Sequence, residues 1–560
     1  MTDFLRSVPR GARASRALVL LAFLTVAACG GGGGSYSSSP SPGPPPPGPP
    51  PPPPPVGSGT DVVTYKNDLA RTGQNLTESV LTLANVNSSG FGKLRFLGAD
   101  GLVDAQPLYL SGLSVGGSAH NVVFIATEND TVYAYDSDSG TLLWQKSLLG
   151  TGEMPSDDRS CGQVTPTIGI TSTPVIDRSA GAHGVIYLVA MSIDASQNYH
   201  QRLHALDVTT GGEQFSGPME IAAIYPAAGG GSNTFAPGDY EERAGLLLLN
   251  GVIYTAWTSH CDNSPYTGWV IAYNSSTLGQ TAVLNVAASN AGGGPAIWMA
   301  GGGPAADSSG NIYLLTANGA FDTTLDANGF PNKGDYGNSF LKISTAGGTL
   351  KVSDYFAMYN EVSESASDTD LGSGGAMLLP DVMDSGGTTR HLVVGAGKDG
   401  NLYVVNRDSM GKFNKTSNQI WQELPQVLGG GIWSTPAYFN GSVYYGPQGG
   451  HLLAFPLAAA MLAGTPASRS AATFGYPGTA PAVSANGSAN GIVWAYENAG
   501  SGAVLHAYSA GNLATELYNS TQAANSRDSI GAGNKFITPT IADGKVFVAT
   551  TNGVAVFGLL

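Results

Sequence analysis

Short runs of alternating or wholly apolar residues, separated by turn residues, recur along the chain from residue 106 onward. The clearest stretch covers residues 122–144. It holds two apolar runs, tight turns at residues 128–130 and 136–140, and a third apolar run that ends at Trp144. Val, Ile, Tyr and Phe favour a pleated, half-buried strand, whereas Asn, Asp and Gly supply turns. With the run at residues 106–110, the pattern predicts a sheet of four antiparallel strands.

One such sheet cannot bury both of its faces, and the chain repeats it at intervals of roughly 50–70 residues, which is typical of propeller blades. Copies of the third strand are found at residues 132–136, 203–207, 270–274, 340–344, 402–406, 452–456, 505–509 and 554–558. Copies of the first strand are found at residues 171–177, 301–307, 434–439, 479–484 and 537–542. The sequence therefore predicts an all-β fold, an eight-bladed β-propeller of four-stranded antiparallel blades.

Turn residues between the first and second strands support the same blade pattern. Asn-Gly and Asp-Gly provide the positive φ angles of a type I′ turn. Such dipeptides begin at Asn250, Asn440, Asn486 and Asp543. Proline in the first strand fits an edge strand, because proline has no N–H to donate to a neighbour.

The last blade lacks an outer strand, since the chain ends just beyond its third strand. Residues 92–98 have no local hairpin partner and lead directly into the first blade. We therefore expect this segment to supply the missing strand and close the ring, which protects the sheet edges.

Composition is consistent with many short strands and tight turns. The 560 residues include 78 glycines, only 12% of residues are charged, and the formal net charge is −15. An acidic surface repels phosphate backbones, so nucleic acid is not expected as a partner. We expect a monomer.

The amino terminus has the pattern of a targeting sequence. Four arginines within residues 6–16 precede an apolar run at residues 17–28, which is too short to span a bilayer and is typical of a signal peptide. Residues 26–29 resemble the lipobox of bacterial lipoproteins, which implies cleavage before Cys29 and its lipidation. In such lipoproteins an Asp after the lipidated Cys favours the inner membrane, and Gly30 at that position implies the outer membrane. Whether the protein faces the periplasm or the cell surface stays open. We expect a signal peptide at residues 1–28, a disordered Gly/Ser/Pro-rich tether at 29–60 and the propeller at 61–560.

Longer strings carry a family resemblance. The cassette VYAYDSDSGTLLW at residues 132–144 resembles the PQQ-type (pyrroloquinoline quinone) propeller repeat of quinoprotein alcohol dehydrogenases and of a lipoprotein in outer-membrane protein assembly. NDLARTGQNL at residues 67–76 and GAGKDGNLYVVNRD at residues 395–408 are similar to extracytoplasmic propellers largely without assigned function. The resemblance implies the fold and leaves the function open.

Several features of the quinoprotein dehydrogenases are missing. Those enzymes have an adjacent Cys-Cys disulfide beside the quinone, which this chain lacks, and no C-x-x-C-H haem motif is present. We therefore assign no catalytic residue and expect no cofactor. The leading hypothesis is a lipid-anchored binding or scaffold protein with an envelope protein or a glycan as partner. The alternative is a dehydrogenase of alcohols or sugars that uses PQQ with Ca²⁺.

Cys161 and Cys261 form the one remaining cysteine pair if Cys29 is lipidated. A disulfide between them is expected in an oxidising compartment, with two buried free thiols as the alternative.

The segments that enter the innermost strands should line the mouth of the central channel. A planar ligand could stack there on a tryptophan while an arginine pairs with its anionic group; the alternative is packing between blades and a surface ion pair. The candidate residues are Asp104, Gln106, Thr171, Glu242, Arg243, Trp298, Asp370 and Trp433.

Two loops are further candidates. Residues 257–269 concentrate aromatic and polar side chains that suit partner or glycan recognition, or simply an ordered loop: Trp257, His260, Asp262, Tyr266 and Trp269. A second loop is rich in carboxylates and is a weak candidate for Ca²⁺, against a solvated turn: Asp322, Asp326 and Asp335.

Overall fold

The computed structural model describes residues 61–289, 293–499 and 502–560. The predicted signal peptide, Cys29 and the tether lie outside the described residues. Nearly all regular structure in the described ranges is β; the exceptions there are one short α-helix, α1 (Glu361–Ala366), and five 3-10 helices of three residues each. No helix in these ranges is long and apolar enough to cross a membrane.

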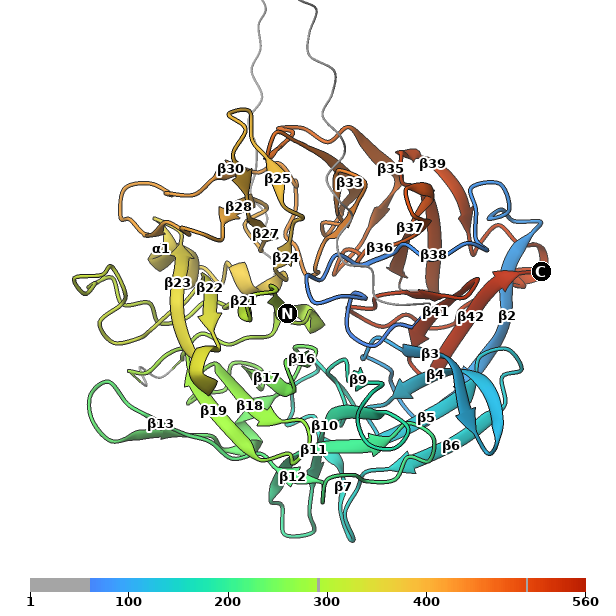
Figure 1. Cartoon of the computed structure of the whole chain (residues 1–560), viewed down its shortest axis with the longest axis horizontal. Coiled ribbons are helices and arrows are strands. Elements are labelled where there is room, and N and C mark those ends of the chain that lie inside the picture. Colours follow the sequence, from blue (N-terminus) through green and yellow to red (C-terminus); the bar gives the residue numbers. More distant parts are fainter. Residues whose placement is uncertain (1–60, 290–292, 500–501) are drawn as a thin grey trace, which may run out of the picture. The chain divides into compact units, whose positions relative to one another are not determined.

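Eight antiparallel sheets are arranged as the blades of a propeller, which confirms the predicted fold (Figure 1). Blade 1 comprises β3 (Leu108–Val115), β4 (Ser118–Ala126), β5 (Thr131–Asp136) and β6 (Leu142–Ser147). Blade 2 comprises β9 (Val175–Asp177), β10 (Val185–Ile193), β11 (Tyr199–Asp207) and β12 (Met219–Glu220). Blade 3 comprises β16 (Leu247–Leu249), β17 (Val252–Ser259), β18 (Trp269–Asn274) and β19 (Gln280–Asn285). Blade 4 comprises β20 (Ala305–Ala306), β21 (Asn311–Leu315), β22 (Ser339–Ser344) and β23 (Lys351–Ala357).

The second half of the ring repeats this order from the innermost to the outermost strand. Blade 5 comprises β24 (Met377–Leu378), β27 (Leu392–Ala396), β28 (Leu402–Asn406) and β30 (Gln422–Leu424). Blade 6 comprises β31 (Ala437–Phe439), β32 (Ser442–Tyr445), β33 (Gly450–Ala458) and β35 (Ser468–Phe474). Blade 7 comprises β36 (Ala482–Asn486), β37 (Ala489–Ala499), β38 (Gly502–Ser509) and β39 (Asn512–Asn519). Blade 8 comprises β40 (Thr540–Ala542), β41 (Lys545–Thr550), β42 (Gly553–Leu559) and β2 (Phe91–Gly98).

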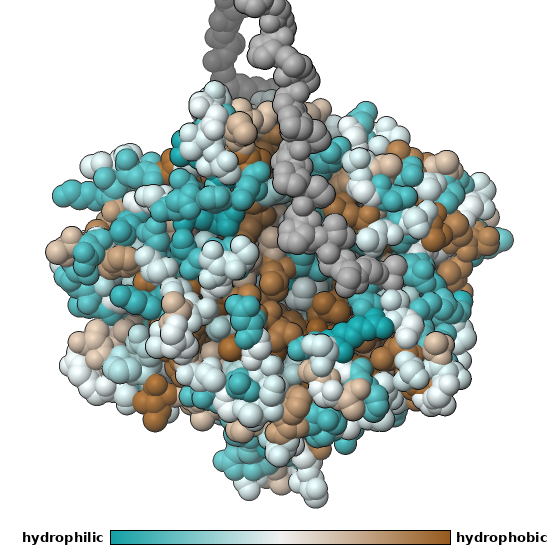
Figure 2. All heavy atoms as spheres, in the orientation of Figure 1, coloured by the Kyte–Doolittle hydropathy of each residue, from teal (hydrophilic) through white to brown (hydrophobic). Residues whose placement is uncertain are grey.

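The middle strands of the blades form the core, because both of their faces are covered by neighbouring blades. All six residues of β5 are buried. Trp144, on the outer strand β6, donates its indole N–H to the carbonyl of Val208 at 3.0 Å and so connects blade 1 to blade 2. Figure 2 shows apolar residues gathered toward the middle of the ring.

The hairpin turns largely have the predicted geometry. Asn250 and Gly251 both adopt positive φ, as a type I′ turn requires, and the turns at Asn440 and Asp543 match them. At residues 486–487 only Gly487 has positive φ, so the type I′ prediction is wrong there. The pairing of Asn486 with Ala489 places Gly487 first in the two-residue loop, where a type II′ turn needs glycine.

The ring is closed as the sequence predicts. Strand β2 pairs antiparallel with β42, from Phe91 opposite Leu559 to Gly98 opposite Gly553. The Phe91 ring packs against Trp494 of blade 7, with the ring centroids 5.4 Å apart. The C-terminus therefore lies beside β2 (Figure 1).

Residues 62–78, hereafter the strap, contact every blade from inside the ring. Figure 1 shows this segment in blue, crossing the middle of the propeller. Its backbone or side chains form a hydrogen bond at or beside the innermost strand of each blade, with Tyr109, Ile176, Leu246, Ala306, Leu378, Tyr438, Val483 and Ile541. Innermost strands are sheet edges with unpaired N–H and C=O groups, and the strap satisfies part of that edge.

Two buried cations hold the strap in place. Arg71 is fully buried and donates to the carbonyls of Pro304 (2.9 Å), Tyr65 (2.8 Å) and Leu246 (3.3 Å). Lys66 donates from Nζ to the carbonyls of two prolines that precede innermost strands, Pro436 and Pro481. Burial lowers the pKa of Lys66 to about 7.

We predict that Arg71→Met destabilises the whole propeller. Several buried carbonyls lose their donor, and each unsatisfied buried group costs about 1–3 kcal/mol. A matched control is Arg469→Met, which removes an exposed arginine from β35. Chemical denaturation should show a much lower midpoint for Arg71→Met than for the control; equal midpoints would contradict a structural role for the strap.

Candidate functional site

The mouth of the channel lies at the end away from the strap. In every blade one residue lies five positions before the residue that contacts the strap, in the segment that leads into the innermost strand. These eight residues, hereafter the mouth ring, are Asp104, Thr171, Glu241, Gly301, Ser373, Trp433, Gly478 and Phe536. The repeat register thus places acidic, aromatic and small residues together at one opening.

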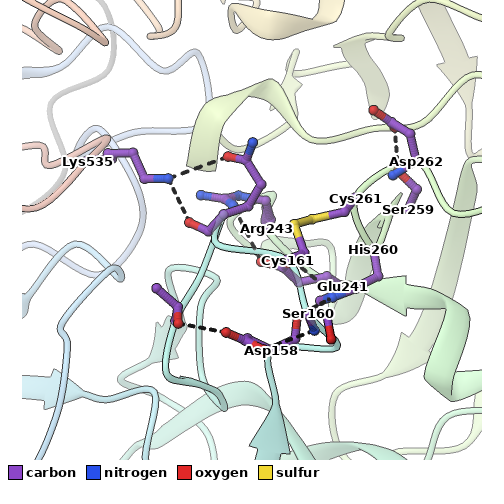
Figure 3. The surroundings of a disulfide bond; sticks show 12 residues. Asp158, Ser160, Cys161, Glu241, Arg243, Ser259, His260, Cys261, Asp262 and Lys535 are labelled. Atoms are coloured by element: carbon purple, nitrogen blue, oxygen red, sulfur yellow. Dashed lines mark hydrogen bonds and ion pairs between the residues drawn. A yellow bond between two sulfur atoms is a disulfide. The ribbon is translucent and has the colours of Figure 1, made fainter. Parts of the chain in front are cut away.

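Two cations lie beside the mouth ring. Arg243 is 6% exposed, and its guanidinium carbon lies 5.0 Å from the centroid of the Phe536 ring. Its nearest anion is Glu241, with Nη1 and Oε1 separated by 3.6 Å, and its Nε has no hydrogen-bond partner. Lys535 Nζ donates to the carbonyl of Gln163 at 2.7 Å. Burial, and then the neighbouring charge of Arg243, lower the pKa of Lys535. Figure 3 shows both cations near Glu241.

Buried carboxyl groups lie on the other side of the mouth. Glu128 Oε2 accepts hydrogen bonds from the N–H of Gly169 (2.7 Å) and the hydroxyl of Thr171 (3.0 Å), while Oε1 has no partner. Burial, and then the neighbouring Asp104, raise the pKa of Glu128 well above its usual value. Asp104 itself accepts from the amide of Asn534 at 2.9 Å. The mouth therefore combines buried cations with the Glu128 carboxyl group, whose raised pKa keeps it protonated to higher pH.

Four aromatic side chains form a wall around the same opening. Phe536 lies edge-on to Trp298 and to Tyr476, with centroids 6.3 Å and 6.4 Å apart. Tyr476 in turn lies 5.6 Å from Trp433. Beside this wall is a small pocket of about 220 Å³, including space open to solvent, lined by Trp433, Asn534 and Phe536 among others.

The predicted disulfide is present. Cys161 and Cys261 are bonded, with their Cα atoms 6.3 Å apart. Cys161 precedes blade 2, and Cys261 lies in the loop between β17 and β18 of blade 3. The bond therefore joins loops of neighbouring blades next to Glu241 and Arg243 (Figure 3).

Some residues predicted for the mouth have other roles. Gln106 accepts a hydrogen bond from the backbone N–H of Lys66 at 3.0 Å, so it faces the strap. Asp370 is buried and forms an ion pair with Lys398 at 2.7 Å. Glu242 is buried and accepts from the hydroxyl of Ser172 at 3.3 Å. The ion pair expected between Glu242 and Arg243 is wrong, because Arg243 faces Glu241 instead.

Burial favours the ordered-loop alternative for residues 257–269, because the aromatic side chains proposed for recognition are buried. Trp257 and Trp269 are opposite each other on β17 and β18 and fully buried. Tyr266 and His260 are buried as well, and exposed Asp262 accepts from the hydroxyl of Ser259 at 2.9 Å. Aromatic rings that fill the core cannot stack on a partner, so this cluster stabilises blade 3.

The carboxylates of the blade 4 loop do not converge on one point. Asp322 accepts from the N–H groups of Thr324 and Lys333, and Asp326 accepts from those of Asn328 and Phe330. Asp335 accepts from the N–H of Ser289. Within the described ranges these three residues form no group with metal-binding geometry. They act here as turn residues.

Sequence reasoning missed several residues of the site. Phe536 is at the same repeat position as Trp433, and aligning the repeats would have identified it together with its neighbour Lys535. Glu241 also occupies that position, although residues 237–246 do not resemble the repeat. Glu128 lies in a turn between strands, and no sequence pattern distinguishes it from a surface turn residue.

Comparison with solved structures supports the fold alone. The quinohemoprotein alcohol dehydrogenase from Comamonas testosteroni has a TM-score of 0.56 at 14% identity, over 89% of this chain and 80% of that chain. A europium-containing methanol dehydrogenase has a TM-score of 0.54 at 14% identity, over 89% of this chain and 98% of that chain. BamB from Moraxella catarrhalis has a TM-score of 0.46 at 13% identity, over 83% of this chain and 97% of that chain. No protein-family model and no curated protein matches the sequence. The fold is a PQQ-like β-propeller.

We predict that Glu242 makes stability depend on pH. Burial raises the pKa of Glu242 well above its usual value of 4.5. In the unfolded chain the group ionises near that value, so its stabilising contribution is complete below about pH 4.5 and is lost as pH rises through the folded pKa. Glu242→Gln keeps an acceptor for Ser172 but cannot ionise, and it should gain stability over the wild type between pH 5 and 8 while matching it at pH 4.

Urea denaturation at several pH values tests this prediction. Glu423→Gln, which changes a half-buried glutamate on the outer strand β30, provides the control. The difference between the control and the wild type should be the same at every pH. If the free energy of unfolding varies with pH in the same way for Glu242→Gln and for the wild type, ionisation of Glu242 is not coupled to folding.

Proposed function

We propose that this protein is a non-catalytic binding propeller of the cell envelope that holds a small planar anion at the channel mouth. The observation that carries the proposal is the guanidinium of Arg243, which is buried while its Nε lacks a partner. Buried cationic donors are normally satisfied, and a carboxylate would accept from such a donor in a charge-assisted hydrogen bond. Lys535 lies in the same opening and adds a second positive charge.

The aromatic wall supports a planar ligand. Trp298 and Trp433 are partly exposed, on opposite sides of Phe536 and Tyr476. Aromatic rings contribute about 0.5–1.5 kcal/mol beyond area burial when they pack against another ring. Since the strap crosses the other end of the channel, a ligand would enter from the mouth.

The proposed location is the outer membrane, through a lipid on Cys29 and the tether that follows it. An acidic, tethered monomer suits capture of a small molecule in the envelope. A protein or glycan partner is not part of the proposal, because the aromatic loop expected to bind it is buried.

A quinoprotein dehydrogenase is the second candidate. The observation in its favour is that the carboxyl groups of Asp104, Glu128 and Glu241 influence one another's charge at the mouth, and carboxylate oxygens are the donors that Ca²⁺ prefers. Within the described ranges, however, these three residues form no group with metal-binding geometry. The arrangement does not fit PQQ with Ca²⁺. Burial raises the pKa of Glu128, and the disulfide joins residues 100 positions apart rather than an adjacent pair.

The test is ligand binding at the mouth. Tryptophan fluorescence of the protein is titrated with phthalate, a simple aromatic dicarboxylate, and with PQQ in the presence and absence of Ca²⁺. Phthalate should bind saturably, and Arg243→Gln should weaken it by about 10-fold or more, because a charge-assisted hydrogen bond is worth about 1.5–3 kcal/mol. Arg390→Gln is the matched control, since Arg390 also lies over an aromatic ring, at 4.6 Å from the Trp421 centroid.

The outcomes separate the two candidates. If neither phthalate nor PQQ binds, the binding proposal is contradicted. If Arg243→Gln and Arg390→Gln bind the ligand with equal affinity, the ligand does not bind at the mouth. Dye-linked oxidation of an alcohol by the PQQ and Ca²⁺ form would instead support the dehydrogenase.

A further inference from the structure

The disulfide has a histidine beside it. A ring nitrogen of His260 and the sulfur atoms of Cys161 and Cys261 all lie within 4.8 Å of one another. Figure 3 shows the three side chains between the loop before blade 2 and the loop between β17 and β18. Two cysteines and a histidine form one of the ligand sets that bind Zn²⁺ in proteins.

The hydrogen bonding of His260 leaves one ring nitrogen ready to bind a metal ion. Its Nε2 lies 2.9 Å from the carbonyl oxygen of Asp158. A carbonyl oxygen only accepts, so Nε2 carries the proton and Nδ1 carries a lone pair. His260 is 1% exposed, and its Nδ1 is buried without a hydrogen-bond partner. Histidine ligands of metal ions are typically oriented in this way, with the other ring N–H donated to a backbone carbonyl.

Glu241 supplies an oxygen on the same side of the ring. Its Oε2 lies 3.9 Å from His260 Nδ1, and its Oε1 is buried without a hydrogen-bond partner. The side chain is 3% exposed, and its one close cation is Arg243, at 3.6 Å. Glu241 is not among the residues whose ligand atoms all lie within 4.8 Å of one another, so its side chain has to move toward an ion bound by the other three. A carboxylate can then complete the four-coordinate tetrahedral geometry of Zn²⁺.

We propose that reduction of the disulfide converts this cluster into a Zn²⁺ site formed by Cys161, Cys261, His260 and Glu241. A dithiol reductant passes two electrons and two protons to the sulfurs, the S–S bond breaks, and the reductant becomes a disulfide. Zn²⁺ then displaces the two thiol protons, which leave to solvent, and binds both thiolates. The disulfide form has no thiolate to offer, so metal binding and the disulfide exclude each other.

The position of the cluster allows this exchange. Both cysteines are partly exposed, so a reductant and a metal ion can reach them, whereas His260 and Glu241 are buried. Asp158 also accepts the backbone N–H of Cys161 at 2.8 Å, so the same carbonyl orients the loop that carries the first ligand. The site joins the same two loops as the disulfide, and a bound ion would therefore replace the covalent connection between blades 2 and 3.

The test uses the whole protein in both redox states. The protein is reduced with a phosphine, freed of reductant without oxygen and titrated with Co²⁺, whose absorption reports thiolate ligands. Reduced protein should bind one Co²⁺ with a thiolate charge-transfer band, and Zn²⁺ should then remove the band. The oxidised protein should show no such band.

Variants identify the ligands. His260→Gln and Glu241→Gln should each weaken Zn²⁺ binding by about 10-fold or more, because even changes behind the ligands cost about 10–100-fold. His451→Gln is the matched control, since its ring nitrogen lies 3.2 Å from the carbonyl of Ala472 on blade 6. Absence of a charge-transfer band in reduced protein would overturn the proposal, provided circular dichroism shows a folded propeller. An unchanged Zn²⁺ affinity in His260→Gln would also overturn it.

Discussion

The hydrogen bonds between the strap and the innermost strands are the interaction on which the rest of the propeller depends. Each innermost strand is a sheet edge, and edges left unpaired in a narrow channel would bury unsatisfied backbone groups. One segment, residues 62–78, meets all eight edges. It also leads along the chain to β2, which completes blade 8. The same N-terminal stretch of chain therefore pairs with the inner edges of the blades and supplies the strand that closes the ring.

The prolines and the buried cations of the strap belong to one arrangement. Proline has no N–H, so a proline that precedes an innermost strand leaves only its carbonyl to be satisfied. Lys66 donates to Pro436 and Pro481, and Arg71 donates to Pro304. Burying a charge is costly unless it is hydrogen-bonded, and these carbonyls provide the acceptors. In three of the repeats, the proline before the innermost strand thus also accepts a hydrogen bond from the strap.

The sequence predicted the blades and the closing strand because both follow from local patterns: alternation, turn dipeptides and a strand missing from the last repeat. The strap could not be predicted in this way. Residues 67–76 are polar and non-repeating, and their partners are spread over the whole chain. For the site, the sequence proposed Trp433 for the mouth, and Trp433 lines the mouth pocket. Trp257 and Trp269, proposed as part of either a recognition loop or an ordered loop, are buried. Their burial depends on the pairing of β17 with β18. The turn residues between the two tryptophans give the sequence the pattern of a surface loop, so this pairing could not be predicted.

Glu241 connects the proposed anion site with the proposed Zn²⁺ site, because its carboxylate faces both the Arg243 guanidinium and the His260 ring. A carboxylate that coordinates a metal ion directs its lone pairs to that ion and offers fewer to a guanidinium. On these two proposals, the positive charge of Arg243 is less compensated when Glu241 binds a metal ion. The affinity of Arg243 for an anion then depends on whether Cys161 and Cys261 form the disulfide or bind Zn²⁺. Thermodynamic linkage makes this coupling reciprocal: an anion held by Arg243 must change the affinity of the reduced cluster for Zn²⁺ by the same factor.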